Sequence, residues 1–292
     1  MNVTRIAVTK GGQDGAIYGG YLFRFDHKGL CRVYSMDQLL LNGSEPAQSI
    51  AEFTLDKADE IAPHSNAVVF GSEFYAKEDE FPLLYTNIYN NYANTENELC
   101  GVCCVYRLTR NGTTFTTKLV QLIEIGFTDE KGLWRSDGEI NDVRPYGNFV
   151  IDTTNCVLYT FVMRDGDRST RYFSFSLPKL LDGAYDPVYG VRKVRLMPKD
   201  VINSFDVPYH NYIQGACFFD GKIYSVEGFN EKIHPALRII DPTMKKQTYF
   251  FDFCESGYST EAEFIDFYNA SCIYGDAHGN YYVIDFDDHK KG

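Results

Sequence analysis

The feature that most constrains the fold of this chain is a strand-rich unit that returns about five times along its 292 residues. Each unit opens with a short polar cluster, continues into a short apolar segment and a turn, and then reaches a second, aromatic strand. The clearest pair is 15–25 (GAIYGGYLFRF) against 215–226 (GACFFDGKIYSV). Repeats of this size are typical of radial or stacked architectures, in which each unit buries its apolar face against its neighbours.

The composition indicates strands rather than helices. Aromatic residues make up 15% of the chain, carried by 22 Tyr and 22 Phe, and such side chains suit a pleated, half-buried surface. No long stretch repeats its apolar residues at helical spacing. We therefore expect an all-β protein with few and short helices, one of them near 177–181.

The last repeat is one strand short, whereas the segment 3–9 (VTRIAVT) alternates well enough to be a strand and has no place in the first repeat. A ring in which the N-terminal strand completes the last blade solves both problems and protects the strand edges. The sequence thus predicts a five-bladed β-propeller that forms a single domain over 1–292. The expected blades are 15–55, 66–125, 146–197 with 191–197 as its fourth strand, 214–253, and 263–286 together with 3–9.

The net charge and the lack of long apolar runs argue against nucleic acid and membrane as partners. A formal net charge of -12 disfavours nucleic acid and anionic membrane, both of which need a basic surface. No apolar run approaches the roughly 20 residues of a membrane helix. Met1 to Thr9 contains one Arg and no apolar signal region, which predicts a cytoplasmic protein, or a secreted one if a leader has been removed. The sequence does not indicate an oligomeric state.

The eight Cys residues include one C-x-x-C, from Cys100 to Cys103, a spacing used by zinc and redox sites. A structural zinc site needs a second pair of ligands, and no second C-x-x-C or H-x₃₋₅-H follows. We expect buried strand thiols and neither a metal site nor a cofactor, with a divalent ion in the axial channel as the open alternative.

The five opening clusters would converge at one end of the propeller axis, because the loops that enter the innermost strands form one face of the central channel. Carboxylates, amides, His and Arg around a pit suit a hydroxyl-rich ligand, which needs both donors and acceptors. The alternative is that these groups hydrogen-bond to one another or hold water at a narrow axis. The candidate residues are Gln13, Asp14, His64, Asn66, Asp142, Arg144, Gln214, Glu261 and Glu263, with His210 and Asn211 close by.

In size and repeat layout the whole chain resembles the five-bladed propeller hydrolases of the arabinanase and levansucrase type. The resemblance implies cleavage of a glycosidic bond by a carboxylic acid and a carboxylate base, with a third acid that tunes the pair. It implies Asp14 as the base and sets Asp142 near the tuning acid. Gln214 stands where the resemblance implies a Glu acid and cannot donate a proton in that way, so Glu261 or Glu263, one repeat further on, would have to replace it.

Three functions follow from these observations. The leading hypothesis is a propeller that binds a small polar ligand, above all a carbohydrate, at its axial face. The second is a glycoside hydrolase with Asp14 as base, Asp142 as orienting acid and Glu263 as proton donor. The third is a protein-interaction scaffold, which an exposed apolar patch and a plugged channel would favour. The fold alone does not choose among them, because one fold hosts many functions. The residues expected to bind the ligand are Gln13, His64, Asn66, Arg144, Gln214 and Glu261.

Overall fold

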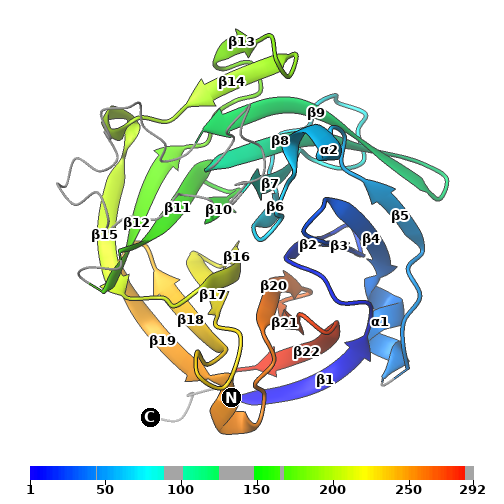
Figure 1. The fold of residues 1–292 in the computed structure, drawn as a ribbon, viewed down its shortest axis with the longest axis vertical. Coiled ribbons are helices and arrows are strands. Elements are labelled where there is room, and N and C mark those ends of the chain that lie inside the picture. Colours follow the sequence, from blue (N-terminus) through cyan, green and yellow to red (C-terminus); the bar gives the residue numbers. More distant parts are fainter. Residues whose placement is uncertain (44, 89–100, 125–147, 165–167, 287–292) are drawn as a thin grey trace.

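Five sheets surround a central axis in the computed structural model, which describes residues 1–43, 45–88, 101–124, 148–164 and 168–286 (Figure 1). The innermost strands of the five sheets contact one another in cyclic order around that axis. The predicted five-bladed β-propeller is therefore confirmed.

In every blade the four strands given below pair antiparallel from the axis outward, and the first three of them follow one another in sequence. Blade one consists of β2 (Gly15–Tyr18), β3 (Tyr21–Phe25), β4 (Leu30–Ser35) and β5 (Ala51–Thr54). Blade two contains β6 (Val68–Phe70), β7 (Leu84–Ile88), β8 (Val102–Asn111) and β9 (Thr114–Glu124). Blade three contains β10 (Asn148–Asp152), β11 (Val157–Arg164), β12 (Ser169–Ser176) and β15 (Asn203–Pro208). Blade four contains β16 (Ile213–Phe219), β17 (Lys222–Glu227), β18 (Ala236–Asp241) and β19 (Lys246–Asp252). Blade five contains β20 (Ala262–Tyr268), β21 (Ser271–Asp276), β22 (Asn280–Asp285) and β1 (Asn2–Val8).

The ring closes where the predicted N-terminal strand completes the last blade. β1 pairs antiparallel with β22, from Asn2 opposite Asp285 to Val8 opposite Asn280. Ala7 of β1 is 0% exposed and belongs to a buried cluster with Phe264 and Tyr281 of blade five and Leu22 and Tyr34 of blade one. The closing strand therefore also fills the core between the first and last blades.

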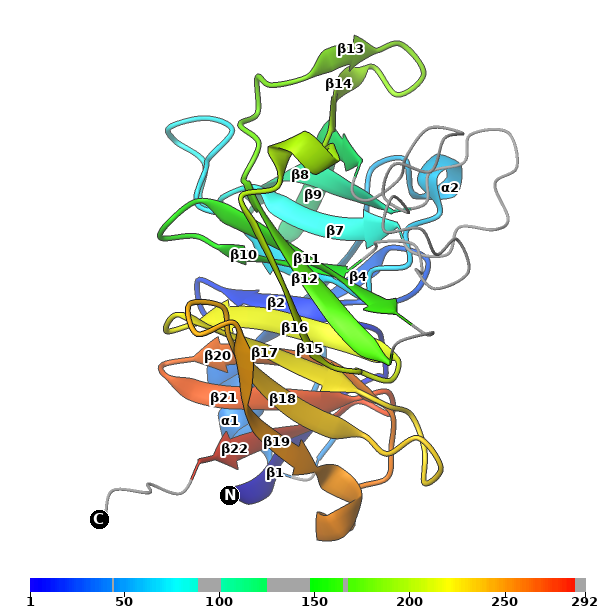
Figure 2. The same ribbon diagram turned by 90° about the vertical axis from the view of Figure 1, so that its left-hand side faces the viewer.

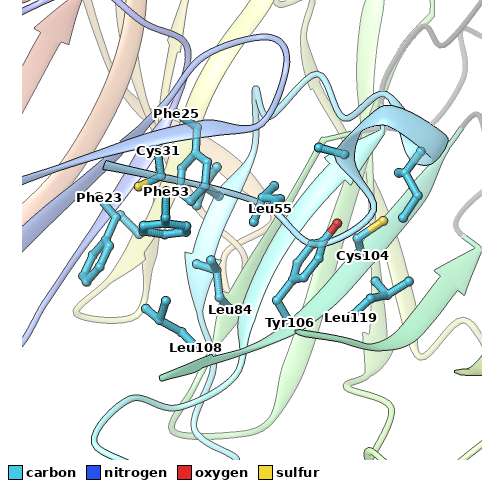
Figure 3. Close-up of a cluster of buried hydrophobic side chains, with 14 of the residues drawn as sticks. Phe23, Phe25, Cys31, Phe53, Leu55, Leu84, Cys104, Tyr106, Leu108 and Leu119 are labelled. Atoms are coloured by element: carbon cyan, nitrogen blue, oxygen red, sulfur yellow. The ribbon is translucent and has the colours of Figure 1, made fainter. Parts of the chain in front are cut away.

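Aromatic side chains fill the spaces between blades, as Figure 3 shows for blades one and two. Phe23 of β3 meets Phe70 of β6 and Phe115 of β9 edge to face, at centroid distances of 5.2 and 5.7 Å. Such tilted contacts are favourable for aromatic rings and fill the wedge between two twisted sheets. Cys104 of β8 is a buried thiol in this core, whereas the buried thiol of Cys103 lies in the core shared with blade three. Cys100 lies outside the described residues.

The third blade differs from the prediction. Its fourth strand is β15, whereas 191–197, which the sequence analysis assigned to that position, contributes β14 (Val191–Arg195) to the sheet of blade two. β14 runs parallel to β9 and forms a hairpin with β13 (Ala184–Asp186). Charge explains this pairing, because Arg195 contacts Glu124 of β9 at 2.5 Å and Lys193 contacts Asp186 at 2.7 Å.

The helices also differ from the prediction. The segment 177–181, where a helix was expected, forms a turn in which Lys179 N donates to the Asp182 carboxylate at 2.9 Å and Lys179 O accepts from the Gln121 amide at 2.7 Å. The helices of the described residues include α1 (Met36–Asn42) and α2 (Ala58–Ile61), with short 3₁₀ turns at η2 (Pro198–Asp200) and η3 (Phe253–Ser256). None of the described helices is long and apolar enough to cross a membrane.

The closing strand provides a stability prediction. Replacing Ala7→Glu places a charge at a fully buried position of β1. We expect the free energy of unfolding to fall by about 3 kcal/mol or more, because a buried charge without a partner is costly. The matched control is Thr4→Glu on the exposed side of the same strand, which should change it by less than about 1 kcal/mol. Urea denaturation measures both, and equal effects of the two substitutions would contradict the role assigned to β1.

Candidate functional site

The inner strands β2, β6, β10, β16 and β20 begin at the same end of the axis, and hydrogen bonds link the polar residues at their starts. These bonds join each blade to the next around the complete ring. We call this set of side chains the axial polar ring. It consists of Gln13, Asp14, Asn66, Asn87, Asn148, Gln214, Glu261 and Glu263.

Asp14 joins blade one to blade two. Its Oδ2 accepts from the backbone N–H of Val68 at 3.0 Å, and its own N–H donates to the carbonyl of Ser65 at 3.2 Å. The side chain is 0% exposed. Burial raises the pKa of Asp14 well above its usual range, although the backbone N–H groups and Arg24 oppose this shift. Burial thus shifts the Asp14 carboxyl toward its neutral form.

Two asparagines that the sequence analysis missed join blades two, three and four. The Asn87 amide donates to Asn66 Oδ1 and, at 3.3 Å, to Asn148 Oδ1. The Asn148 amide in turn donates to the carbonyl of Ile213 at 3.2 Å. All three asparagines are buried. The signal in the sequence was weak, because Asn87 is one amide beside Thr86 in the short strand 84–88 (LYTNI).

Two amide–carboxyl pairs join blades four, five and one. Gln214 Nε2 donates to Glu261 Oε1 at 2.7 Å, and Gln13 Nε2 donates to Glu263 Oε1 at 3.0 Å. Glu263 is 1% exposed, and burial raises its pKa to about 8 despite the opposing charge of Arg24. Glu261 is partly exposed, and its pKa is also raised by burial. Gln13, Gln214, Glu261 and Glu263 therefore meet in two hydrogen-bonded pairs across these three blades.

Arg24 of β3 is a buried cation beside these acids and was not predicted. Its Nη2 donates to the carbonyls of Gly12 at 2.8 Å and Asp276 at 3.2 Å. Its guanidinium lies over the rings of Phe264 and Tyr281, at 5.4 and 5.7 Å from the centroids. Arg24 is 1% exposed, so its charge acts on Asp14 and Glu263 without much screening by solvent.

Several atoms of this group lack a hydrogen-bonding partner among the described residues. They are Asp14 Oδ1, Glu263 Oε2, and Nε and Nη1 of Arg24. A buried polar atom without a partner costs free energy, and such atoms need an explanation such as a bound polar molecule. A bound polar molecule, such as a water, would provide the missing hydrogen bonds.

Gly215 makes the close approach of these groups possible. A Cβ at this position would lie 2.8 Å from the carbonyl oxygen of Glu263 and 3.2 Å from Asp14 Oδ1. The absence of a side chain brings the start of β16 against both acids. Figure 2 shows β2, β16 and β20 at the middle of the molecule, where β20 packs against both β16 and β2.

The remaining predicted residues lie around the same end or outside the described part of the chain. His64 is half-buried at the loop that enters β6, and its pKa is lowered by burial and by His27. His210 is 0% exposed and packs against Tyr172, with Nδ1 3.4 Å from the tyrosine oxygen. Asp142 and Arg144 lie outside the described residues.

An aromatic pair, Tyr212 and Phe229, was also missed by the sequence analysis. Tyr212 precedes Gln214 by two residues and is 40% exposed. It adopts a positive φ of 61°, which is rare for a residue with a large side chain, and its ring meets Phe229 edge to face at 5.1 Å. Uncommon backbone conformations of this kind gather at functional sites.

The opposite end of the axis contains a cavity of about 200 Å³. It is lined by the far ends of the inner strands, including Tyr18, Thr153, Cys217, Phe218 and Asp266. Asp266 accepts from the N–H of Ile17 at 2.7 Å, and burial raises its pKa to about 6. This end carries fewer polar side chains than the axial polar ring.

Metal ligands converge elsewhere. In the described part of the chain, the side chains with ligand atoms close enough together to hold a metal ion are His234, Asp252 and Cys254, on blade four. The carboxyls of the axial polar ring are not among them. The buried charge of Arg24 between Asp14 and Glu263 also opposes a cation at the axis.

Comparison with known proteins does not assign a family. No family model and no curated protein matches the chain. Among solved structures, a luciferin-regenerating enzyme is 9% identical, with a TM-score of 0.46 over 98% of this chain and 96% of that one. The computationally designed Ika8 protein is 10% identical, with a TM-score of 0.37 over 97% and 100% of the two chains. The hydrazine synthase of Kuenenia stuttgartiensis is 9% identical, with a TM-score of 0.42 over 90% and 61%.

The raised pKa of Glu263 predicts a pH-dependent stability. The folded chain keeps the Glu263 proton up to about pH 8, whereas an unperturbed Glu releases it near pH 4.5. The folded state thus binds more protons over this interval, so this residue makes stability fall as the pH rises through it. In Glu263→Gln the side chain stays neutral, and its oxygen can still accept from Gln13. We expect the free energy of unfolding of this variant, relative to the wild type, to increase by more than about 1 kcal/mol between about pH 5 and pH 8.

Urea denaturation at several pH values measures this difference. Glu261→Gln is the matched control, because Glu261 is partly exposed and its pKa should matter less for stability. A constant difference between Glu263→Gln and the wild type across the pH range would show that Glu263 is ionised in the folded protein.

Proposed function

We propose that the protein binds a small hydroxyl-rich ligand of the carbohydrate class at the end of the axis where the inner strands begin. The observation that carries this proposal is the pair of buried oxygens of the axial polar ring that have no partner among the described residues, Asp14 Oδ1 and Glu263 Oε2, beside the buried Arg24. They lie beside the amide–carboxyl pairs of Gln13 and Gln214, which are partly exposed.

The protonation of the two acids favours a neutral ligand over a cation. With their raised pKa values, Asp14 and Glu263 tend to remain carboxylic acids, each with one O–H donor and further acceptor capacity. Arg24 adds N–H donors and no acceptor. A sugar hydroxyl both donates and accepts, so it can satisfy each of these groups in turn.

The partly exposed residues around the buried acids support the same class of ligand. One N–H of Gln214 and one oxygen of Glu261 are used in their mutual bond, which leaves further donor and acceptor capacity for a ligand. Tyr212 and Phe229 add an apolar edge beside them. Aromatic rings with a polar partner nearby suit ligands that have both apolar faces and hydroxyl groups.

Binding is better supported than hydrolysis. A glycosidase needs one protonated acid and one ionised carboxylate, so the environments of its two carboxyls must move their pKa values apart. Burial raises the pKa of both Asp14 and Glu263. Asp14, at 0% exposure, also uses one oxygen for the backbone of blade two, which suits a positioning role better than that of a base.

A second candidate function, that of a protein-interaction scaffold, is favoured by one observation. Large apolar side chains are exposed around β13, namely Leu181 (79%), Tyr185 (68%) and Val188 (57%). Neighbouring exposed apolar side chains are a feature of protein-binding surfaces. This projection belongs to the outer edge of blade two, away from the axis, so the two functions do not exclude each other (Figure 1).

Calorimetric titration with a panel of monosaccharides, oligosaccharides and polyols tests the ligand proposal. We expect at least one of them to bind the wild type, and Gln214→Ala and Tyr212→Ala to weaken that binding at least tenfold, or about 1.4 kcal/mol. Tyr185→Ala is the matched control, because it removes an exposed tyrosine far from the axis. Chromatography of the same mixtures after incubation detects cleavage, and released products would favour the hydrolase instead.

Two results would overturn the proposal. One is that no member of the panel binds at millimolar concentration. The other is that binding is unchanged in Gln214→Ala but is lost in Thr153→Ala, which would move the site to the cavity at the opposite end of the axis.

A further inference from the structure

Three side chains with metal-binding chemistry meet on blade four, away from the axial polar ring. His234 lies near the end of the loop between β17 and β18, Asp252 is the last residue of β19, and Cys254 lies in η3. One ligand atom from each, a ring nitrogen, a carboxylate oxygen and a thiol sulfur, lies within 4.8 Å of the other two. Neither the axial ligand site nor any short cysteine or histidine motif includes these residues.

Backbone hydrogen bonds hold the three residues in place. Asp252 pairs with Ala236 across the β18–β19 ladder, and Phe253 N donates to Pro235 O at 2.9 Å. Asp252 Oδ1 accepts from the N–H of Cys254 at 2.9 Å, which begins η3. The two segments that carry the ligands are therefore fixed to each other by main-chain contacts.

Gly228 fixes the His234 loop from the other side. A Cβ at this position would lie 2.1 Å from the carbonyl oxygen of His234, so the loop closes tightly over a glycine. The side chain of Asn230 accepts from the N–H groups of Lys232 and Ile233 at 2.8 and 3.0 Å. These contacts order the loop before any ligand binds.

The donor atoms already face one another. His234 Nδ1 lies 2.6 Å from Asp252 Oδ2, and the two side chains are 47% and 17% exposed, so an ion from solvent can reach them. Cys254 is also partly exposed. Zinc bonds of about 2.0–2.3 Å in a tetrahedron set the ligand atoms roughly 3.3–3.8 Å apart. The distance between His234 Nδ1 and Asp252 Oδ2 is shorter than this range, so these two side chains would rotate apart to admit a metal.

We propose that His234, Asp252 and Cys254 form a binding site for one divalent transition metal of the zinc class, with solvent as the fourth ligand. The donor set selects the metal, because thiolate and imidazole favour zinc over magnesium and calcium, which prefer oxygen ligands. Three protein ligands leave one tetrahedral position open. The proposal does not depend on the proposed function at the axis.

The surrounding charge supports a cation. On binding, the Cys254 thiol releases its proton to solvent, and the thiolate and the Asp252 carboxylate together balance the two charges of the metal. Glu231 acts electrostatically on Cys254, and Glu255 acts on His234. Metal binding would replace the His234–Asp252 hydrogen bond and would tie the β17–β18 loop to η3, from which the chain continues to Glu261 and β20.

Cobalt(II) is the probe for this site, because a thiolate ligand gives Co²⁺ a charge-transfer absorption in the near ultraviolet. The full chain, free of any histidine tag, is stripped with a chelator and titrated with Co²⁺ under reducing conditions. We expect the band to saturate at one equivalent of Co²⁺ and to disappear when Zn²⁺ is added. Cys254→Ser should abolish the band, and His234→Ala should weaken Co²⁺ affinity by at least about tenfold.

Cys156→Ser is the matched control, because Cys156 is an exposed thiol outside this cluster. It should leave the band and the affinity unchanged. Circular dichroism confirms that each variant is folded, and His234 and Cys254 are exposed enough for their substitutions to be tolerated. Absence of the band in the wild type, or its persistence in folded Cys254→Ser, would overturn the proposal and leave Asp252 as a helix cap paired with His234.

Discussion

The pairing of β1 with β22 is the contact on which the ring depends. It joins the first strand of the chain to the last one of blade five, so that β1 covers the outer edge of β22. The same strand fills the core between blades one and five through Ala7. The bond from Gln13 to Glu263 crosses this junction, so closure also assembles one side of the axial polar ring. The contacts that close the ring therefore also position part of the candidate ligand site.

The axial polar ring serves two purposes that oppose each other. Its hydrogen bonds join every blade to the next, which fixes the blades around the axis. Yet burying Asp14, Arg24 and Glu263 costs solvation, and apolar side chains of similar volume would often stabilise a core as well or better. Natural proteins depart from the most stable packing mainly at functional sites. The polar axis is easier to explain by a ligand than by stability alone.

Much of the architecture could be predicted from the number of strands in each repeat. The segment 3–9 had no partner in its own repeat and the last repeat lacked a strand, so closure followed. The pairing of strands could not be predicted in the same way, because Val191–Arg195 and Asn203–Pro208 are both short strands and the local pattern does not tell which neighbour each one joins.

The residues of the site also divide into those that the sequence could identify and those that it could not. Gln13, Asp14, Gln214, Glu261 and Glu263 precede or begin strands and were found, whereas Arg24, Asn87 and Asn148 lie within strands and were not. His234 and Asp252 meet across 18 positions of sequence, a separation that no short motif covers.

The path of β14 has a consequence for how the molecule is made. After β9 the chain builds β10, β11 and β12 of blade three, returns to blade two as β14, and only then supplies β15. During synthesis the outer edges of β9 and β12 therefore both remain unpaired until 191–208 has been made, because this segment supplies β14 and β15. The two blades are completed almost together. Long-range pairings of this kind slow folding, because the intervening chain must be ordered first. Blades two and three are interleaved into one cooperative unit, so neither could be excised, duplicated or exchanged as a module without the other.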